Sequence, residues 1–428
     1  MRMEGGKPAV LLELPSQYIG LSTEFKGNVS DPGSGVRKLW IGLLKDGKEV
    51  VLKDEEFPSQ SFISGGSVTD LPIKIQIEPR KLGIDAGKAM IRIAAWDYSW
   101  RNWGQGNRAY LEQEVIIDME PPVIDILTTA HNINQGGAGL VIYRVSETDA
   151  KTGVAVGGNF FPGYSGYFKD GGVFLAFIAL DHLQGTDTEI HVVATDQASN
   201  SARAGLTYYL KKKAFKKDTV SISDAFLNWK MPEFDIPYSK GGHLAGIEKF
   251  LAVNNGMRKE NEALFASLAG KTEKKFYWEG TFLRLPKSAP KAGFADKRSY
   301  SYKGKLIDHQ YHMGIDLAST AHSPVPAANN GKVVFADVNG IYGKTVVLDH
   351  GFGLFSLYSH LSRIMVQKGE MVSKGNILGS TGTTGLAGGD HLHYGMMVQN
   401  VFINPLEWWD SVWIENNITS KIQDIHNG

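Results

Sequence analysis

The sequence predicts a mainly β protein with two tandem immunoglobulin-like β-sandwiches, a helical connector and a C-terminal antiparallel β domain. Three observations indicate this architecture. Short strand-like segments separated by turn residues fill the N-terminal half, a helical periodicity runs from residue 241 to 269, and strand patterns return from about residue 275. A chain of 428 residues has room for about three units, at roughly 150 residues per domain.

The first sandwich is expected over residues 8–119. In KAMIRIAAWD at 88–97, alternation places Ile91, Ile93 and Ala95 on one face of a strand, opposite Met90, Arg92 and Ala94. Four aromatic residues end this strand or follow it, namely Trp96, Tyr98, Trp100 and Trp103. We expect them to pack in the core and at the rim of the sandwich, with contact to sugars as the alternative.

The second sandwich is expected over residues 120–212. It begins at Glu120-Pro121-Pro122, where two prolines end any strand ladder. Its segment EIHVVATDQASN at 189–200 echoes IRIAAWDYSWRN at 91–102, which places Asp97 and Asp196 in equivalent positions. The lysine-rich run LKKKAFKK at 210–217 marks its end, and we interpret this run as an exposed linker rather than as a contact with an anionic polymer.

The connector is expected over residues 213–274, with a helix at 241–269. Residues at steps of three and four form one stripe, consisting of Leu244, Ile247, Leu251, Asn254, Met257, Asn261, Leu264 and Leu268. The two asparagines are expected to cap or hydrogen-bond loops of a neighbouring domain, and Gly256 offers a point at which the helix could split. Plain interdomain packing is the preferred interpretation, and a gating role is the alternative.

Composition excludes several classes of function. Forty-five basic residues balance forty-five acidic ones, which argues against nucleic acid as a partner. The absence of cysteine excludes disulfides, thiol nucleophiles and cysteine-bearing zinc sites, so a metal would need His, Asp or Glu ligands. The opening MRMEGGKPAV lacks the apolar stretch of a signal peptide, and we expect any leader or membrane anchor to lie outside this chain.

The C-terminal domain, expected over residues 275–415, contains the residues suited to catalysis. Eight of the twelve histidines fall between residues 309 and 426. His312 and Asp316 lie four residues apart in a strand that runs into a loop, and His391 and His393 share one face of a strand. A catalytic zinc site uses three protein ligands and leaves a position for water. His312, Asp316 and one histidine of the pair would supply them.

A further histidine is offered by the segment GLFSLYSHLS at 353–362. Alternation there predicts that Ser356, Tyr358 and His360 share a polar face. Zinc-dependent hydrolysis needs a base for the water proton and a donor for the developing oxyanion. His360 and His391 can fill these two roles in either order. The glycine-rich run GSTGTTGLAGG at 379–389 is interpreted as a tight loop that leads into the strand of His391, because it lacks a phosphate-loop motif.

This part of the chain resembles the lysostaphin/LytM-type zinc endopeptidases, a family of peptidoglycan hydrolases. The matching segments are HMGID at 312–316, SPVPAANNGKVVFA at 323–336, YGKTVVLDHGFGLFSLYSHL at 342–361, KGEMVSKGNILGSTGTTGLAGGDHLHYGM at 368–396 and the closing NP at 404–405. The N-terminal β modules are similar to those of an envelope-associated Gram-negative branch. The resemblance implies that His312, Asp316 and His393 bind Zn²⁺, and that His360 and His391 are catalytic.

The resemblance also implies an activity and a location. We expect hydrolysis of peptide bonds in peptidoglycan stem peptides or cross-links, in the periplasm or outside the cell. Tyr302, Tyr311 and Tyr358 are the candidates for a tyrosine that helps to hold the transition state, while His309, His322 and His350 are expected to be loop or supporting residues. The second expected partner is a regulatory protein of the cell envelope. The alternative function is a non-catalytic scaffold or activator that binds peptidoglycan or a cell-wall amidase.

Overall fold

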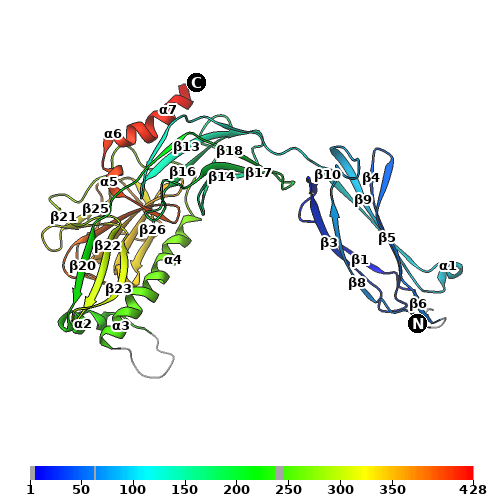
Figure 1. Ribbon diagram of the computed structural model, residues 1–428, viewed down its shortest axis with the longest axis horizontal. Helices are drawn as coiled ribbons and strands as arrows, with labels where there is room; N and C mark the ends of the chain where they lie inside the picture. Colours follow the sequence, from blue (N-terminus) through cyan, green and yellow to red (C-terminus); the bar gives the residue numbers. More distant parts are fainter. Residues whose placement is uncertain (1–4, 62–63, 237–244, 428) are drawn as a thin grey trace. The chain divides into compact units, whose positions relative to one another are not determined.

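The computed structural model describes residues 5–61, 64–236 and 245–427 (Figure 1). It divides into two compact units, of which the first comprises Met1–Val123, Asp149–Lys151 and Ala194–Ala202 and the second the remainder of the chain. The prediction of a mainly β protein is confirmed. Within the described ranges, no helix is both long and apolar enough to cross a bilayer.

The first unit is built on two main sheets and a short hairpin. The three-stranded sheet has the order β1 (Ala9–Glu13), β3 (Thr23–Ser30), β8 (Asp70–Ile77). The five-stranded sheet has the order β2 (Tyr18–Ile19), β10 (Arg108–Ile117), β9 (Gly87–Asp97), β4 (Val36–Lys45), β5 (Lys48–Glu56). The hairpin pairs β6 (Ser59–Ser61) with β7 (Gly65–Gly66), and the short helix α1 (Arg101–Gly104) lies between β9 and β10.

Alternation along β9 is as predicted from the sequence. Ile91, Ile93 and Ala95 are fully buried in the core cluster, whereas the alternate positions face outward. Packing of the aromatic set in the core is not observed, because none of the four residues belongs to this cluster. Rim packing holds for Tyr98, which is half-buried and donates to the Phe57 carbonyl. Trp96 lies on the outer face of the sheet and Trp103 is fully exposed.

The echo between the two β modules extends to their hydrogen bonds. The Asp97 carboxylate accepts bonds from the backbone N–H of Asn107 (2.7 Å) and from its side-chain amide (2.8 Å). Asp196 accepts the same two bonds from Asn200, both at 2.8 Å. Each buried aspartate therefore fixes the turn that follows its strand. An immunoglobulin-like topology for the two modules stays a prediction.

The second β module consists of three small sheets. Their strand orders are β11 (Ile124–Ile126), β13 (Ala138–Val145), β16 (Val173–Ala179); β12 (His131–Asn134), β19 (Tyr208–Lys211); and β15 (Asn159–Pro162), β14 (Lys151–Val156), β17 (Ile190–Thr195), β18 (Ser201–Gly205). The lysines of the run at 210–217 are exposed. That run ends in β20 (Lys217–Ile222), which begins the next sheet.

Helices occupy the connector. They are α2 (Asp224–Lys230), the 3₁₀ turn η1 (Met231–Glu233), α3 (Gly246–Ala252), the π-helical turn η2 (Val253–Met257) and α4 (Arg258–Ala269). The predicted helix at 241–269 is thus helical from Gly246 onward, and its residues 241–244 lie outside the described ranges. Gly256 falls within η2, so the helix changes its hydrogen-bond pattern there without ending.

The C-terminal part contains three sheets. The small one has the order β20, β22 (Asp296–Tyr302), β23 (Lys305–His312). The large one has the order β21 (Ala289–Ala292), β24 (Ile315–Ala318), β32 (Leu392–Val398), β28 (Leu354–Leu361), β27 (Lys344–Gly351), β26 (Gly331–Val338), β30 (Met371–Val372), with β33 (Val401–Ile403) paired to β32. The third has the order β25 (Pro324–Pro326), β31 (Ile377–Ser380), β29 (Arg363–Ile364).

Short helical elements complete this part of the chain. They are η3 (Gly340–Tyr342), α5 (Pro405–Trp408), α6 (Ser411–Ile414), the π-helical turn η4 (Glu415–Thr419) and α7 (Ser420–Asn427). The NP pair at 404–405 has a structural explanation, because the Asn404 side chain accepts a bond from the N–H of Leu406 and Pro405 occupies the first helical position. The predicted boundaries at 119, 212 and 274 stay predictions.

Candidate metal centre and catalytic cleft

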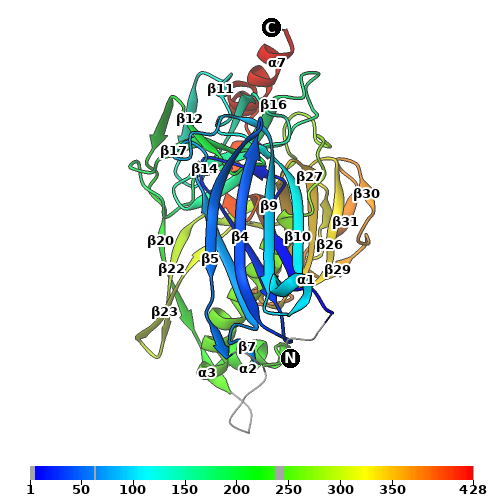
Figure 2. The same ribbon diagram turned by 90° about the vertical axis from the view of Figure 1, so that its right-hand side faces the viewer.

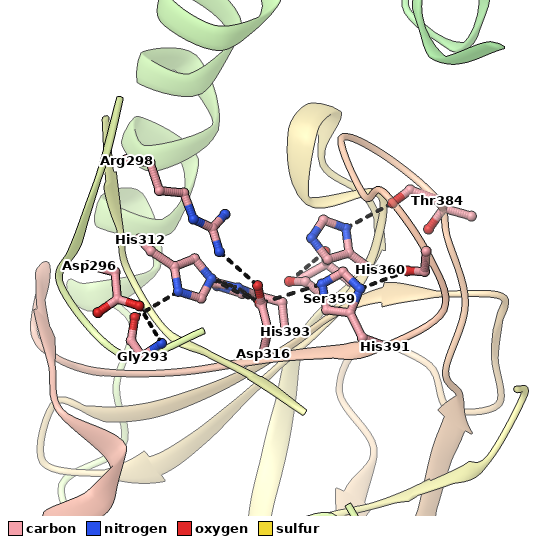
Figure 3. Close-up of polar contacts among 12 residues, drawn as sticks. Gly293, Asp296, Arg298, His312, Asp316, Ser359, His360, Thr384, His391 and His393 are labelled. Atoms are coloured by element: carbon pink, nitrogen blue, oxygen red, sulfur yellow. Dashed lines mark hydrogen bonds and ion pairs between the residues drawn. The ribbon is translucent and has the colours of Figure 1, made fainter. Parts of the chain in front are cut away.

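A sharp turn between two strands brings His312 and Asp316 together. His312 is the last residue of β23 and Asp316 is the second residue of β24. The His312 Nε2 and Asp316 Oδ1 atoms are 2.9 Å apart. Figure 3 shows that the His312 Nδ1 atom points instead to the Gly293 carbonyl, at 2.8 Å. The Nδ1–H group donates there, which leaves the Nε2 lone pair free to bind a metal.

His393 joins this pair from the neighbouring strand. Asp316 and His393 are cross-strand partners in the register of β24 with β32. The His393 Nδ1 atom lies 3.0 Å from Asp316 Oδ1 and 2.9 Å from His312 Nε2. Gly314 makes room for this ring, because a Cβ atom at that position would lie 2.6 Å from His393 Nε2. The glycine of HMGID therefore has a steric role beside the ligand set.

The three converging atoms fit a zinc ion. Two imidazole nitrogens and one carboxylate oxygen face one another at 2.9–3.0 Å, an arrangement that requires a cation or shared protons between them. Tetrahedral zinc with bonds of about 2.0–2.1 Å would separate its ligand atoms by about 3.3 Å. Burial lowers the pKa of His393 to about 4, so this ring is neutral near pH 7 and can serve as a ligand.

Arg298 holds the second oxygen of the ligand carboxylate. It extends from β22, and its guanidinium donates to Asp316 Oδ2 at 2.9 Å (Figure 3). Burial alone would raise the pKa of Asp316, but the surrounding histidines, His312 first among them, hold that pKa well below its usual range. Asp316 is therefore ionised at neutral pH and oriented from both sides. Sequence reasoning missed Arg298, which lies fourteen residues before His312 on a different strand.

His360 enters the cleft because β28 is distorted there. Its φ angle is +61°, and the register of β27 with β28 shifts between Lys344 and Val346. Tyr358 pairs with Tyr394, whereas Ser359 pairs with His393. The predicted common face of Tyr358 and His360 is wrong, because the bulge turns His360 toward His393, with ring centroids 5.8 Å apart.

The glycine-rich loop orients both candidate catalytic histidines. His360 Nδ1 lies 2.8 Å from the Thr384 carbonyl, and His391 Nδ1 lies 2.8 Å from the Gly389 carbonyl. Each Nδ1–H donates to its carbonyl, so each Nε2 atom is left to act in the cleft. The two rings are neighbours, with centroids 4.9 Å apart. The run at 379–389 thus leads into the strand of His391, and it also fixes the tautomer of both rings.

The two rings differ in their electrostatic surroundings. Burial, with the neighbouring His391 and His393, holds the pKa of His360 well below its usual value. Burial also disfavours charge on His391, but the Asp316 carboxylate, 3.4 Å from its Nε2, raises its pKa overall. The pair therefore contains one ring that stays neutral and one that accepts a proton more readily.

A hollow of about 490 Å³ contains all five predicted site residues, His312, Asp316, His360, His391 and His393. Residues from the connector form part of its wall, among them Ile222, Phe250 and Arg258. The stripe asparagines fasten this wall, because Asn254 donates to Asp308 Oδ2 (2.7 Å) and the N–H of Ile341 donates to Asn261 (2.8 Å). The bonds expected of these asparagines are therefore present.

The tyrosine candidates do not line this hollow. Tyr302 donates to Asp224, Tyr311 packs against His182, and Tyr358 bonds to the backbone of Ala328. Tyr300 and Tyr342 line it instead. Tyr342 belongs to η3, and its ring centroid is 5.7 Å from that of His393. The sequence signal that could have identified it is the YG that opens the segment at 342–361.

The remaining histidines near the motifs have structural positions. His309 is exposed, with Ser299 3.1 Å from its Nδ1 atom. His322 is exposed beside Thr381 and Asp390. His350 is fully buried between the Asn330 carbonyl and Ser356.

Comparison with known proteins assigns the fold around this hollow to a family. Residues 310–405 match the model of peptidase family M23. The chain carries a peptidase M23 domain. The match contains all five predicted site residues and ends at Pro405, the first residue of α5. Arg298 and the connector residues that form part of the wall of the hollow precede the matched range.

Named relatives of the M23 domain act on peptidoglycan. Peptidoglycan DD-endopeptidase ShyB of Vibrio cholerae is 28% identical over 170 residues, which are 37% of this chain and 38% of the relative. Peptidoglycan DD-endopeptidase ShyA of the same organism is 38% identical over 96 residues, 22% of either chain. The chain therefore spans well under half the length of these relatives.

Solved structures with similarity to this chain include two peptidases. A putative peptidase M23 from Pseudomonas aeruginosa has a TM-score of 0.39 at 19% identity and covers 64% of this chain and 93% of its own. The catalytic domain of lysostaphin from Staphylococcus simulans has a TM-score of 0.22 at 24% identity and covers 34% of this chain and 96% of its own.

Proposed function

We propose that the M23 domain is a zinc-dependent endopeptidase that hydrolyses peptide bonds in peptidoglycan stem peptides or cross-links. The convergence of His312, Asp316 and His393 within hydrogen-bonding distance of one another is the observation that carries this proposal. These three residues would hold the ion through Nε2, Oδ1 and Nδ1. When bound, zinc lowers the pKa of water and polarises a carbonyl group.

The chain's own residues perform the proton transfers. His360 and His391 present their Nε2 atoms to the hollow, each with its Nδ1–H held by a backbone carbonyl. One ring takes a proton from the attacking water on its Nε2 lone pair, and the other, protonated on both nitrogens, donates a hydrogen bond from its Nε2–H to the oxygen that becomes negative. Arg298 holds Asp316 in position through its second carboxylate oxygen. The raised pKa of His391 favours this ring as the donor, and the lowered pKa of His360 favours that ring as the acceptor of the water proton.

The names of the relatives, peptidoglycan DD-endopeptidases, support peptidoglycan as the substrate. We infer that this chain works in the cell envelope, in the periplasm or outside the cell. The match covers only part of the length of these relatives. The bond that is cut and an envelope regulatory partner are therefore proposed for this chain and not carried over as findings.

Metal analysis combined with mass spectrometry of products from cross-linked muropeptides tests the proposal. The His393→Ala variant is expected to lose both zinc and turnover, whereas His360→Ala is expected to keep zinc and lose turnover. His309→Ala is the matched control, because its side chain is exposed and lies outside the hollow. Full turnover by His393→Ala would refute the proposal. A wild-type chain that neither binds zinc nor cleaves muropeptides would favour the scaffold alternative.

A further inference from the structure

The outer face of the five-stranded sheet in the first unit carries a group of aromatic side chains that the core does not use. Figure 2 shows this sheet face-on, with β5, β4, β9 and β10 side by side. The strand register aligns Trp40 of β4, Ala94 of β9 and Tyr110 of β10 in one row across the sheet. The next row contains Lys38, Trp96 and Arg108. Three aromatic residues therefore surround one small residue.

This face is concave because the small side chain of Ala94 is surrounded by the flat aromatic rings of Trp40, Trp96 and Tyr110. Ala94 has no exposed surface although it points away from the core cluster, so its outer-face neighbours cover it. Gly42 lets the Trp40 indole lie flat along its strand, because a Cβ atom there would be 2.4 Å from the indole ring. Tyr110 is 47% exposed, and its hydroxyl donates to Glu112 at 2.6 Å, which holds the ring in place. The hollow has a volume of about 470 Å³, within the range of small-ligand sites.

The charges around the hollow are largely neutralised. Lys38 is paired with Asp54 and Glu56, and Arg92 is paired with Glu49 and Glu112. This balance disfavours a polyanion as the ligand. Arg108 is the exception, because no ion pair joins it to any described residue and its guanidinium lies 4.8 Å from the Tyr110 ring centroid and 5.2 Å from that of Trp96. These cation–π contacts hold the guanidinium at the edge of the hollow, where its N–H groups have no carboxylate partner within the described ranges.

From this arrangement we propose that the hollow binds a glycan chain of N-acetylated aminosugars. A pyranose ring has an apolar C–H face, which suits the flat rings of Trp40, Trp96 and Tyr110. It also has a rim of hydroxyl and amide groups, which suits the paired carboxylates and the free donors of Arg108. The choice of aminosugars rests on the proposed function, since peptidoglycan is the polymer on which the M23 domain is proposed to act. The hollow itself is independent of that proposal.

The function of this site is to hold the chain on its polymer. A bound glycan strand places the cross-links of the same polymer within reach of a catalytic domain on the same chain, which raises their effective concentration. Hydrolysis of intact sacculi would then depend on the hollow, whereas hydrolysis of soluble muropeptides would not.

Tryptophan fluorescence and calorimetry with the full chain test the proposal. The probes are the tetramer of N-acetylglucosamine and peptide-free peptidoglycan glycan strands. Saturable binding is expected, with affinity about tenfold or more weaker in Trp40→Ala and Tyr110→Ala. Arg108→Gln leaves the rings in place and is expected to weaken binding less. Tyr209→Ala is the matched control, because this tyrosine is 66% exposed on β19, a strand outside the sheet that bears the hollow.

The outcomes separate this proposal from the proposed function. Binding needs no hydrolysis, so glycan binding by the His393→Ala variant supports the hollow whether or not the M23 domain is active. Absence of saturable glycan binding by the full chain overturns the proposal, as does unchanged binding by folded Trp40→Ala and Tyr110→Ala variants. Binding of soluble stem peptides in the hollow, without binding of peptide-free glycans, would also overturn it.

Discussion

Replacement of Glu407 by glutamine tests the reasoning about buried charge that underlies the site. Glu407 lies in α5, directly after the NP motif, and its carboxylate accepts bonds from the Asn134 side chain (2.6 Å) and the N–H of Ala138 (2.9 Å). Burial raises the pKa of this carboxyl from 4.5 to about 7, against the lowering effect of these two bonds. Glu407 therefore links α5 to β12 and β13, and it is largely protonated in the folded chain below pH 7.

The sign of the stability effect follows from the two pKa values. A raised folded-state pKa favours the folded chain below the unfolded value of 4.5 and loses that contribution as pH rises through about 7. The difference between the folded and unfolded pKa values is worth roughly 3 kcal/mol of stability, at about 1.4 kcal/mol per pKa unit. Roughly 2.5 kcal/mol of this stability is lost between pH 5 and pH 8. Glutamine has the same shape and does not ionise, so Glu407→Gln is expected to remove this dependence.

Urea denaturation at several pH values measures the effect. Hydrogen exchange of peptides from β13 and α5 reports unfolding at this site separately from that of the first unit. The free energy of unfolding of the wild type, relative to Glu407→Gln, is expected to fall by roughly 2.5 kcal/mol from pH 5 to pH 8. Other titrating groups cancel in this difference. Curves that stay parallel within about 0.5 kcal/mol would show that Glu407 ionises normally in the folded chain.

Three further substitutions test the site. Arg298→Gln leaves one oxygen of Asp316 without its partner and is expected to weaken zinc binding about 10- to 100-fold in chelator competition, with a smaller effect for Arg298→Lys. Equal zinc affinities in wild type and Arg298→Gln would show that Arg298 does not support the metal site. Gly314→Ala is expected to displace the His393 ring and lower zinc retention, whereas Gly256→Ala, with open space around its Cβ position, is expected to leave it unchanged. Asn261→Ala leaves the N–H of Ile341 without its partner and is expected to cost about 1–3 kcal/mol, measured as lost exchange protection of η3; protection equal to wild type would contradict this role.

The sequence predicted the candidate site wherever local strand geometry determines it. Asp316 and His393 lie opposite each other because their strands pair in register. Alternation places His391 and His393 on one face of a strand, but the choice of His393 as the ligand rested on the family resemblance. His360 was predicted as a site residue but with the wrong neighbours, since a bulge with a positive φ angle breaks the alternation on which the prediction depends. Three of the four N-terminal aromatic residues follow the end of β9 at Asp97, where alternation no longer determines which way a side chain points.

Long-range contacts could not be predicted from spacing. Arg298 reaches Asp316 from another strand, and Glu407 meets Asn134 and Ala138 across more than 260 residues of sequence. Tyr342 lines the hollow because η3 packs between Asn261 and the glycine-rich loop. The close packing against the loop requires Gly343, because a Cβ atom on that residue would lie 2.4 Å from Thr384. None of these pairs has a periodic signal, because each depends on how separate elements meet.

The distribution of site residues between the M23 domain and its flanks suggests how such a chain divides its tasks. The ligand set and both catalytic candidates lie within residues 310–405, and the strands that carry His360 and His393 are buried on both faces. Ile222, Phe250 and Arg258, which line the same hollow without contact to the ligand set, precede that range. The buried Lys230 of α2 joins the two parts by donating to the Thr383 carbonyl, one residue before the carbonyl that orients His360. If the M23 domain acts as proposed, a change in the connector wall would alter which peptide fits beside the metal, while the ligand geometry would stay the same. Substrate preference is best sought in these flanking residues, and the chemistry in the M23 domain.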